Sequence, residues 1–509
     1  MEFNGLLTVL TFFPLIGVAA ILLLKPIKRE SDNLIRGIAI GTSVITLLIS
    51  VIVLVPFQSD QSGLQLIDRA DWITVGRINI DYFLAVDGIS ILFILLTTFI
   101  TLLAIISSWS AIQSQVKAYY VFMLLLLTGM IGVFLAQDLF LFYIFWEFTL
   151  IPMYFLIGIW GGGKRVYASI KFFLYTMAGS LLMLLAILWL GFNERTFQVP
   201  DLIGASAGMT TTVQALLFLG FGIAFAVKVP IFPFHSWLPD AHTEAPTAGS
   251  VILAGILLKM GTYGFIRFNL PLFPDASIDF APYIAILAII GIIYGAIVSF
   301  PQKDVKRLVA YSSVSHLGFV MLGIFSLNAA GLAGGILQGV NHGLSTGALF
   351  FLVGILYEQR HTRAMSAFGG IWRAMPIFTA LSLVVILSSM GLPGLNGFVG
   401  EFTILLGSMG AEVALGQNAW IYTAFAASGV ILAAIYLLWM FQRVFMGPLD
   451  KDENRSLRDV NGRELAIFLA FLVFIVWIGI YPQPYFDVME QSVSQLLGEM
   501  FGGSVTALR

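Results

Sequence analysis

The chain has 509 residues, of which 59% are hydrophobic and 11% are charged, and its mean hydropathy is +0.95. A soluble domain carries about 25% charged residues, so this composition excludes a soluble globular protein. The net charge of −2 does not favour a nucleic-acid partner, and the absence of cysteine excludes disulfides, thiolate-bound iron–sulfur clusters and thiolate zinc sites within the chain.

Apolar segments recur along the whole chain, and each crossing of a bilayer needs about 20 such residues. The first segment, 6–24, follows no basic stretch and has no convincing cleavage site, so we interpret it as a retained span and not as a signal peptide. The longest, 375–408, exceeds one straight span and is rich in glycine. The pattern predicts an all-α polytopic membrane protein with about fourteen transmembrane helices, at 6–24, 36–56, 88–107, 118–136, 138–158, 170–190, 213–231, 248–268, 282–300, 304–326, 332–356, 375–408, 419–445 and 464–482.

Lysine and arginine are distributed unequally between the two sides of these spans. Nineteen of the 26 lie in or beside the loops that follow odd-numbered spans, five lie on the opposite side, and Lys228 and Lys259 fall inside spans. By the positive-inside rule, the odd-numbered loops face the cytoplasm or the matrix of an organelle, and both termini face the outer side. The expected location is a bacterial plasma membrane or an organellar inner membrane.

Two hydrophilic stretches interrupt the apolar pattern. The outer loop 57–87 contains Asp68, Asp71, Trp72, Arg77 and Asp81, and it is compatible with a small hairpin cap. The stretch 450–463 is a run of charges, which we interpret as a solvated inner loop.

The spans within 118–268 and 282–445 form two sets of five predicted helices. Because five is odd, two similar sets are inverted with respect to each other, a common plan in transporters. The fourth helix of each set contains helix breakers, Pro230 and Pro233 in the first and Gly391, Pro393 and Gly394 in the second. A break inside lipid is tolerated only where protein or a wet cavity satisfies the freed backbone groups, so paired breaks favour a functional cavity over packing kinks. The predicted division is 1–117 for helices 1–3 with the outer loop, 118–268 for the first repeat, 282–445 for the second, inverted repeat, and 446–509 for the inner loop, helix 14 and the C-terminal tail.

Six ionisable side chains stand out within the predicted spans, because a charge inside a bilayer costs at least about 2.5–3.5 kcal/mol. They include two acids and two lysines, and Lys228 is the expected partner of Glu147. A buried lysine releases or takes up a proton when a carboxylate moves away or approaches, and histidine exchanges protons near neutral pH. The series therefore predicts a proton relay formed by Glu147, Lys228, Lys259, His316, His342 and Glu401.

Other interpretations of these residues remain open from the sequence. Lys228 lies near the end of an apolar run and is also compatible with snorkelling to the surface. His316 and His342 are the one histidine pair suited to bis-histidine haem ligation, but a relay is favoured. His235 and His242 flank the broken helix, where capping or cavity lining is favoured over a metal site; His361 is expected at the surface.

One segment carries a family resemblance. Residues 234–250 read FHSWLPDAHTEAPTAGS, which closely resembles the signature of the antiporter-like subunits of proton-pumping NADH–quinone oxidoreductase (respiratory complex I). The fourteen predicted spans and paired five-helix sets fit that family. Within it, the chain resembles the M-type branch, called chain 4 in mitochondria. Three features carry this resemblance: His316 within 311–318, Glu401 at a position where related chains usually carry lysine, and an end about 27 residues after the last span.

The resemblance implies roles for matched positions. Glu147 and Lys228 resemble the charge pair of the fifth and seventh helices, Lys259 the central relay, and Glu401 the residue leading to the outer side; His316 and His342 match positions on a hydrated axis. It implies no cofactor in this chain, since NADH, FMN, iron–sulfur clusters and quinone would belong to partner subunits, and no GxGxxG nucleotide loop follows a predicted strand. The implied partners are other membrane subunits of complex I, with L-type and N-type chains on either side.

The leading interpretation is a proton-translocating subunit driven by quinone reduction in its partners. The alternative with the same fold is a subunit of a cation–proton antiporter or of a membrane-bound hydrogenase complex. A membrane scaffold without transport is the rival from another class, and it predicts that the buried charges tolerate neutral replacement.

Overall fold

The computed structural model describes residues 4–24, 28–76 and 78–502. Lys25, Arg77 and Arg509, which contribute to the charge distribution above, lie outside this part of the chain. Within it, thirteen helices are long and apolar enough to cross a membrane. They are α1 (Leu6–Leu23), α2 (Lys28–Val53), α3 (Ser90–Ala111), α4 (Val116–Leu135), α5 (Leu139–Trp160), α6 (Arg165–Glu194), α8 (Thr211–Lys228), the composite helix Thr247–Leu272, α13 (Pro274–Ser299), α14 (Val305–Ile324), α15 (Ala329–Arg360), α20 (Ala419–Val444) and α22 (Gly462–Ile480).

The predicted span 375–408 is the one that differs from a single helix. It is divided into α17 (Pro376–Ser389) and α18 (Asn396–Met409), which are joined by a non-helical segment. Gly391 and Gly394 in this segment have φ angles of 77° and 92°, a backbone conformation that residues with a Cβ atom rarely adopt. The all-α polytopic fold is thus confirmed, with thirteen continuous spans and one broken one in the described residues.

A second interruption follows α8. The chain leaves the helix after Lys228, and helical structure resumes with α9 (Trp237–Glu244). The Trp237 indole donates a hydrogen bond of 2.9 Å to the carbonyl oxygen of Val227, which ties the two sides of the break together. Both interruptions occur where proline and glycine predicted them.

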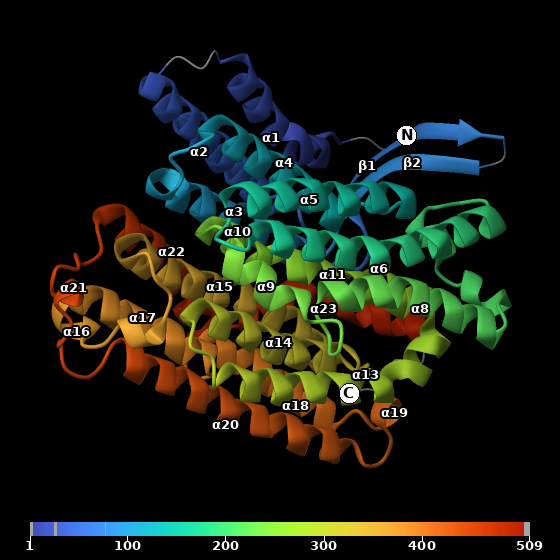
Figure 1. Ribbon diagram of the computed structural model, residues 1–509. Helices are drawn as coiled ribbons and strands as arrows, with labels where there is room; N and C mark the ends of the chain where they lie inside the picture. The colour runs from blue at the N-terminus through green and yellow to red at the C-terminus, as the bar shows by residue number, and fades with distance from the viewer. Residues whose placement is uncertain (1–3, 25–27, 77, 503–509) are drawn as a thin grey trace.

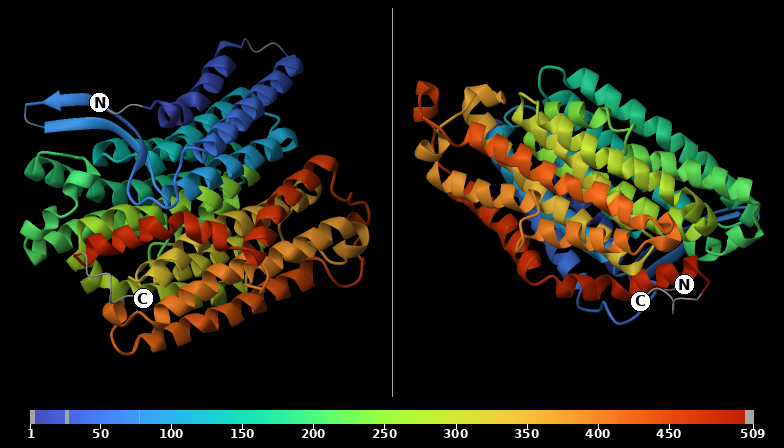
Figure 2. Two further views of the ribbon diagram at one scale, coloured as in Figure 1. Left: turned by 180° about the vertical axis from the view of Figure 1, so that it is seen from behind. Right: turned by 90° about the horizontal axis from the view of Figure 1, so that it is seen from below.

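The long helices run roughly parallel, and two opposite faces carry the connections (Figures 1 and 2). One face carries the antiparallel hairpin of β1 (Gln65–Val75) and β2 (Ile78–Val86), so the hairpin expected in the outer loop is confirmed. We call this the hairpin face. The opposite face carries α16 (Ile371–Ala374) and α21 (Asp452–Arg455) (Figure 1). The remaining short elements are α7 (Val199–Leu202), η1 (Ala205–Gly208), η4 (Met365–Ala367) and α19 (Glu412–Leu415).

The C-terminal segment contains a helix that the sequence analysis did not predict. α23 (Gln483–Met500) lies along the outside of the bundle, in red in Figure 2, and packs against α15. Its buried side chains, among them Met489 and Leu497, lie on one stripe of an otherwise polar helix.

Two helices form the centre of the bundle, the composite Thr247–Leu272 and α15. Both are buried along their most apolar stretch, whereas α1 and α2 keep much of their surface exposed. The composite helix contains α10 (Thr247–Ile252), η2 (Leu253–Leu257), α11 (Leu258–Gly264), η3 (Phe265–Asn269) and α12 (Leu270–Leu272), of which η2 and η3 are π-helical. A π-helical turn frees backbone carbonyls from the regular ladder, so side chains gain access to them.

Candidate functional site

The middle of the composite helix places a lysine in the core. Lys259 is fully buried, and its ammonium group donates to the carbonyl oxygen of Ala254 in the preceding π-helical segment. The Nζ atom also lies 2.6 Å from Nδ1 of His342, on α15. Because an ammonium group only donates hydrogen bonds, Nδ1 of His342 accepts, and the proton of a neutral His342 ring is then on Nε2.

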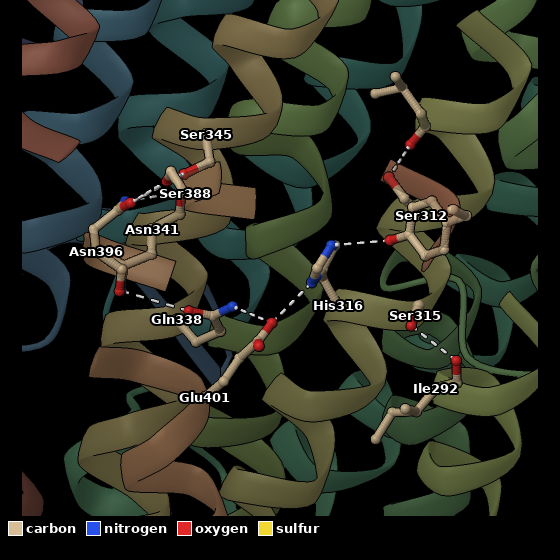
Figure 3. Close-up of polar contacts among 12 residues, drawn as sticks. Ile292, Ser312, Ser315, His316, Gln338, Asn341, Ser345, Ser388, Asn396 and Glu401 are labelled. Carbon is tan, nitrogen blue, oxygen red and sulfur yellow. Dashed lines mark hydrogen bonds and ion pairs between the residues drawn. The ribbon is translucent and has the colours of Figure 1, made fainter. Parts of the chain in front are cut away.

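A second buried pair lies beside the first. His316 on α14 is 4% exposed and Glu401 on α18 is 3% exposed, and Nδ1 of His316 lies 2.9 Å from Oε1 of Glu401. The Gln338 amide donates to the same oxygen at 3.1 Å, and the Tyr436 hydroxyl lies 3.3 Å from Nε2 of His316. Figure 3 shows Gln338 and His316 converging on the Glu401 carboxylate from two helices.

The two pairs meet at the histidines. The rings of His316 and His342 have centroids 6.1 Å apart and an interplanar angle of 57°. A small cavity is lined by both rings and by Asn341. Nε2 of His342, Oδ1 of Asn341 and Oε2 of Glu401 are buried without a hydrogen-bond partner among the described residues. Buried polar atoms of this kind are normally satisfied by ordered water, so the junction has the chemistry of a hydrated site.

A network of amides and hydroxyls connects this junction to the broken helix. The Asn341 amide donates 2.7 Å to the carbonyl oxygen of Asn396, and Oδ1 of Asn396 accepts from Ser388 at 2.5 Å and from Ser345 at 3.2 Å (Figure 3). These bonds fix the start of α18 and hence the position of Glu401 one turn later. This network was not predicted from the sequence. Its signal was present, because Gln338, Asn341, His342 and Ser345 have the i, i+3, i+4, i+7 spacing of one polar helix face.

The other two predicted relay residues are arranged differently. Lys228, at the end of α8, is 1% exposed, and its Nζ lies over the ring of Trp146 at 5.1 Å and that of Phe172 at 5.9 Å. Among the ion pairs of the described residues, none joins Lys228 to Glu147, although their charges interact at longer range. Glu147 is partly exposed on α5, beside the hydroxyl of Ser180. Lys228 is thus buried against aromatic faces, which excludes the snorkelling interpretation in this conformation.

The histidines beside the break have different surroundings. His242 on α9 is fully buried and stacks on Phe350 with centroids 4.5 Å apart, and within the described part of the chain neither of its ring nitrogens has a hydrogen-bond partner. His235 packs on Phe232 and Tyr294. In the described part of the chain, no three histidine, aspartate or glutamate side chains converge on a metal position. His361 is exposed after α15, as predicted.

Comparisons with known proteins identify the family of the chain. The family described as NADH:quinone oxidoreductase/Mrp antiporter, TM, matches residues 136–425. Subunit M of NADH-quinone oxidoreductase from Rhodobacter capsulatus is 43% identical over 97% of this chain and 96% of its own length. Chain 4 of NADH-ubiquinone oxidoreductase from Marchantia polymorpha is 43% identical over 97% of both chains. A chain of respiratory complex I from Thermus thermophilus, solved with bound NADH, is 29% identical, has a TM-score of 0.85, and is matched over 97% of this chain and 99% of its own.

The fold, the broken helices and the matched region define an antiporter-like membrane subunit. Sequence identity of 43% over nearly the full length then narrows the assignment from this class to one family of subunits. The chain belongs to the family of subunit M of NADH-quinone oxidoreductase, also named chain 4, and the resemblance noted in the sequence is confirmed.

Proposed function

We propose that this chain translocates protons as the M-type membrane subunit of an NADH–quinone oxidoreductase, and that Lys259, His342, His316 and Glu401 carry the protons. The observation that supports the relay best is the contact between its two pairs. The Lys259–His342 distance is 2.6 Å, the His316–Glu401 distance is 2.9 Å, and the two histidine rings lie 6.1 Å apart. In each pair, one side chain can release a proton and the other can accept it.

The physical reason for a relay is the cost of these groups inside a bilayer. A charge at the centre of a membrane costs several kcal/mol, and such residues usually mark ion or proton pathways. Within the described part of the chain, Lys259 has one carbonyl and one imidazole as hydrogen-bond partners and no carboxylate in an ion pair. Its charge is therefore stabilised weakly, and a small movement of His342 or of a nearby water changes its affinity for a proton.

Glu147 and Lys228 form the entrance half of the proposed relay. In this conformation the two side chains are too far apart to form an ion pair, as we expect for a pair that opens and closes during turnover. The domain division proposed with it is 1–117, 118–268, 282–445 and 446–509, in which the two central segments are inverted five-helix repeats. The breaks after Lys228 and after Ser389 occupy equivalent places in that scheme.

The energy for pumping comes from partner subunits in this proposal. NADH, FMN, iron–sulfur clusters and quinone belong to those subunits, and the neighbours in the membrane are L-type and N-type antiporter-like chains. The hairpin face, with both termini, lies on the outer side of a bacterial plasma membrane or an organellar inner membrane. The unequal distribution of lysine and arginine supports this orientation.

Membership of the subunit M family favours this function over that of a subunit of an antiporter or a membrane-bound hydrogenase. An experiment distinguishes the proposed proton relay from the alternative of a scaffold without transport. We would measure NADH-driven proton uptake and quinone reduction in vesicles that contain the complex with Glu401→Gln, which keeps the shape of the side chain and removes its charge. Glu412→Gln is the matched control, because Glu412 is exposed at the hairpin face.

We expect Glu401→Gln to lower the pumping rate at least tenfold in an assembled complex, because proton transfer through a positioned acid or base typically contributes about 10²–10⁴-fold. Glu412→Gln should pump normally. Normal pumping by both variants would reject the relay and favour a scaffold.

A further inference from the structure

Tyr436 completes the surroundings of His316. It lies on α20, is 1% exposed, and places its hydroxyl oxygen 3.3 Å from Nε2 of His316. The hydroxyl of Ser312, one helical turn before His316 on α14, lies near the Tyr436 hydroxyl. Ser312 uses its own proton in a 2.7 Å hydrogen bond to the carbonyl oxygen of Val309, so its oxygen is free to accept.

The partners of His316 determine how its two nitrogens are used. Nδ1 faces the Glu401 carboxylate, which only accepts when it is ionised, so Nδ1 carries a proton. Nε2 of the neutral ring is then an acceptor, and the Tyr436 hydroxyl donates to it. A second proton on His316 would reside on Nε2 and would require an acceptor at the same place. A hydroxyl can serve both states, since it turns from donor to acceptor.

We propose that Tyr436 is a positioning residue for His316, whose hydroxyl donates to Nε2 when that nitrogen carries no proton and accepts from Nε2 when it carries one. This inference rests on the relay proposed above. When a proton binds to Nε2, the Tyr436 O–H turns to Ser312. When Nδ1–H breaks, its proton forms the new O–H bond at Glu401 Oε1, and His316 is left neutral with its proton on Nε2. Tyr436 thus keeps the ring aimed at Glu401 in each state, as buried orienting groups do for catalytic histidines.

The test compares two tyrosines of α20. Tyr436→Phe removes the hydroxyl and keeps the ring, and Tyr422→Phe is the matched control, because Tyr422 is only partly buried and lies at an apolar groove. In vesicles with the assembled complex we would measure pumping, the maximal rate of quinone reduction, KM for quinone, and the pH dependence of pumping. We expect Tyr436→Phe to lower kcat and pumping about fivefold, the effect of one hydrogen bond, with KM unchanged and an altered pH profile. Tyr422→Phe should match the unmodified complex in all four.

Two further variants keep the inference falsifiable. If Tyr436→Phe does not assemble, Ser312→Ala removes the second partner of the hydroxyl and should alter the pH profile in the same direction. In a His316→Gln background, Tyr436→Phe should add no further loss, since its role passes through that histidine. A wild-type rate and pH profile for Tyr436→Phe, together with a loss in Glu401→Gln, would overturn this inference alone. Normal pumping by Glu401→Gln would overturn the relay itself.

Discussion

The ammonium group of Lys259 and the imidazole of His342 share a hydrogen bond of 2.6 Å at the centre of the bundle. Each residue is nearly or fully buried, and each lies near the middle of its helix. The two groups cannot both be positively charged at this distance without strong repulsion, so the pair holds at most one positive charge, and a second proton must leave toward His316 or not arrive. The protonation state of Lys259 on the composite helix is therefore coupled to that of His342 on α15.

Replacing Lys259 should therefore disable proton movement without unfolding the protein. Lys259→Met keeps the length of the side chain and removes the charge, and we expect the pumping rate to fall about tenfold, since a hydrogen bond to a charged group contributes roughly 1.5–3 kcal/mol. Lys303→Met, at an exposed position on the face opposite the hairpin, should have no effect. Proton uptake by vesicles, normalised to the amount of assembled complex, measures both. Equal rates for the two variants would remove Lys259 from the relay.

The segment between α17 and α18 is held in place by close packing against Gly479 of α22. A Cβ atom at this glycine would overlap the carbonyl oxygen of Gly394 and the Cα atom of Leu395, which are backbone atoms that cannot turn aside. We expect Gly479→Ala to destabilise the protein by about 1–3 kcal/mol and to lower the midpoint of thermal inactivation of the complex. Gly462→Ala, on the same helix with open space around it, is the control and should leave the midpoint unchanged. Equal midpoints would show that the segment moves freely.

Much of this site could be predicted because charges in apolar segments are rare. Glu401, His316, His342 and Lys259 each interrupt an apolar run, and that alone indicated a buried relay. Which of them touch could not be predicted. His316 and Glu401 are 85 residues apart in the chain, and helical periodicity fixes a face of a helix but not its neighbour.

The same limit explains the outcome for Lys228. Its sequence context indicated a charge partner, and Glu147 was the predicted one, but the structure places the ammonium group over aromatic rings instead. Helix α23 was missed for another reason. Its apolar residues form a narrow stripe among polar ones, so a search for continuous apolar spans does not detect it.

A buried ion pair on the hairpin face should contribute strongly to stability. Asp87 and Arg267 form an ion pair with side chains 6% and 15% exposed, and Arg267 also donates 3.1 Å to the Tyr263 hydroxyl. Asp87→Asn keeps the backbone hydrogen bonds that Asp87 accepts from Ser90 and Ile89 but leaves the arginine charge unpaired. Breaking such a pair costs about 3–5 kcal/mol, so we expect a large fall in the midpoint of thermal inactivation.

Asp452→Asn provides the comparison for that experiment. Its pair with Arg455 is exposed, with side chains 89% and 61% accessible, and exposed pairs contribute little. A second comparison is Asp87→Leu combined with Arg267→Met. This double variant removes both charges and should recover part of the stability that Asp87→Asn loses. If Asp87→Asn and Asp452→Asn have the same midpoint of thermal inactivation, the ion pair between Asp87 and Arg267 does not contribute to stability.

The last prediction concerns pH and Asp138, which precedes α5 on the hairpin face, just outside the span. Its side chain accepts hydrogen bonds from the backbone N–H groups of Phe140 at 2.9 Å, Leu141 at 3.1 Å and Asp81 at 3.1 Å. Burial nevertheless dominates and raises the pKa of Asp138 to about 6, from an ordinary value of 3.8. The folded protein therefore binds this proton more tightly than the unfolded chain does. The resulting stabilisation is fully present below about pH 4 and is lost as the pH rises through about 6.

Asp138→Asn removes this titration and retains an oxygen for the cap of α5. A shift of this size corresponds to about 3 kcal/mol, so the unmodified protein should lose stability relative to Asp138→Asn between about pH 4 and pH 6, with a constant difference above that range. Midpoints of thermal inactivation measured across this range test the prediction, with Asp60→Asn, at an exposed position near the hairpin, as the control. A difference between the unmodified protein and Asp138→Asn that does not change with pH would mean that the Asp138 carboxylate is charged throughout, and that its three backbone N–H donors outweigh its burial.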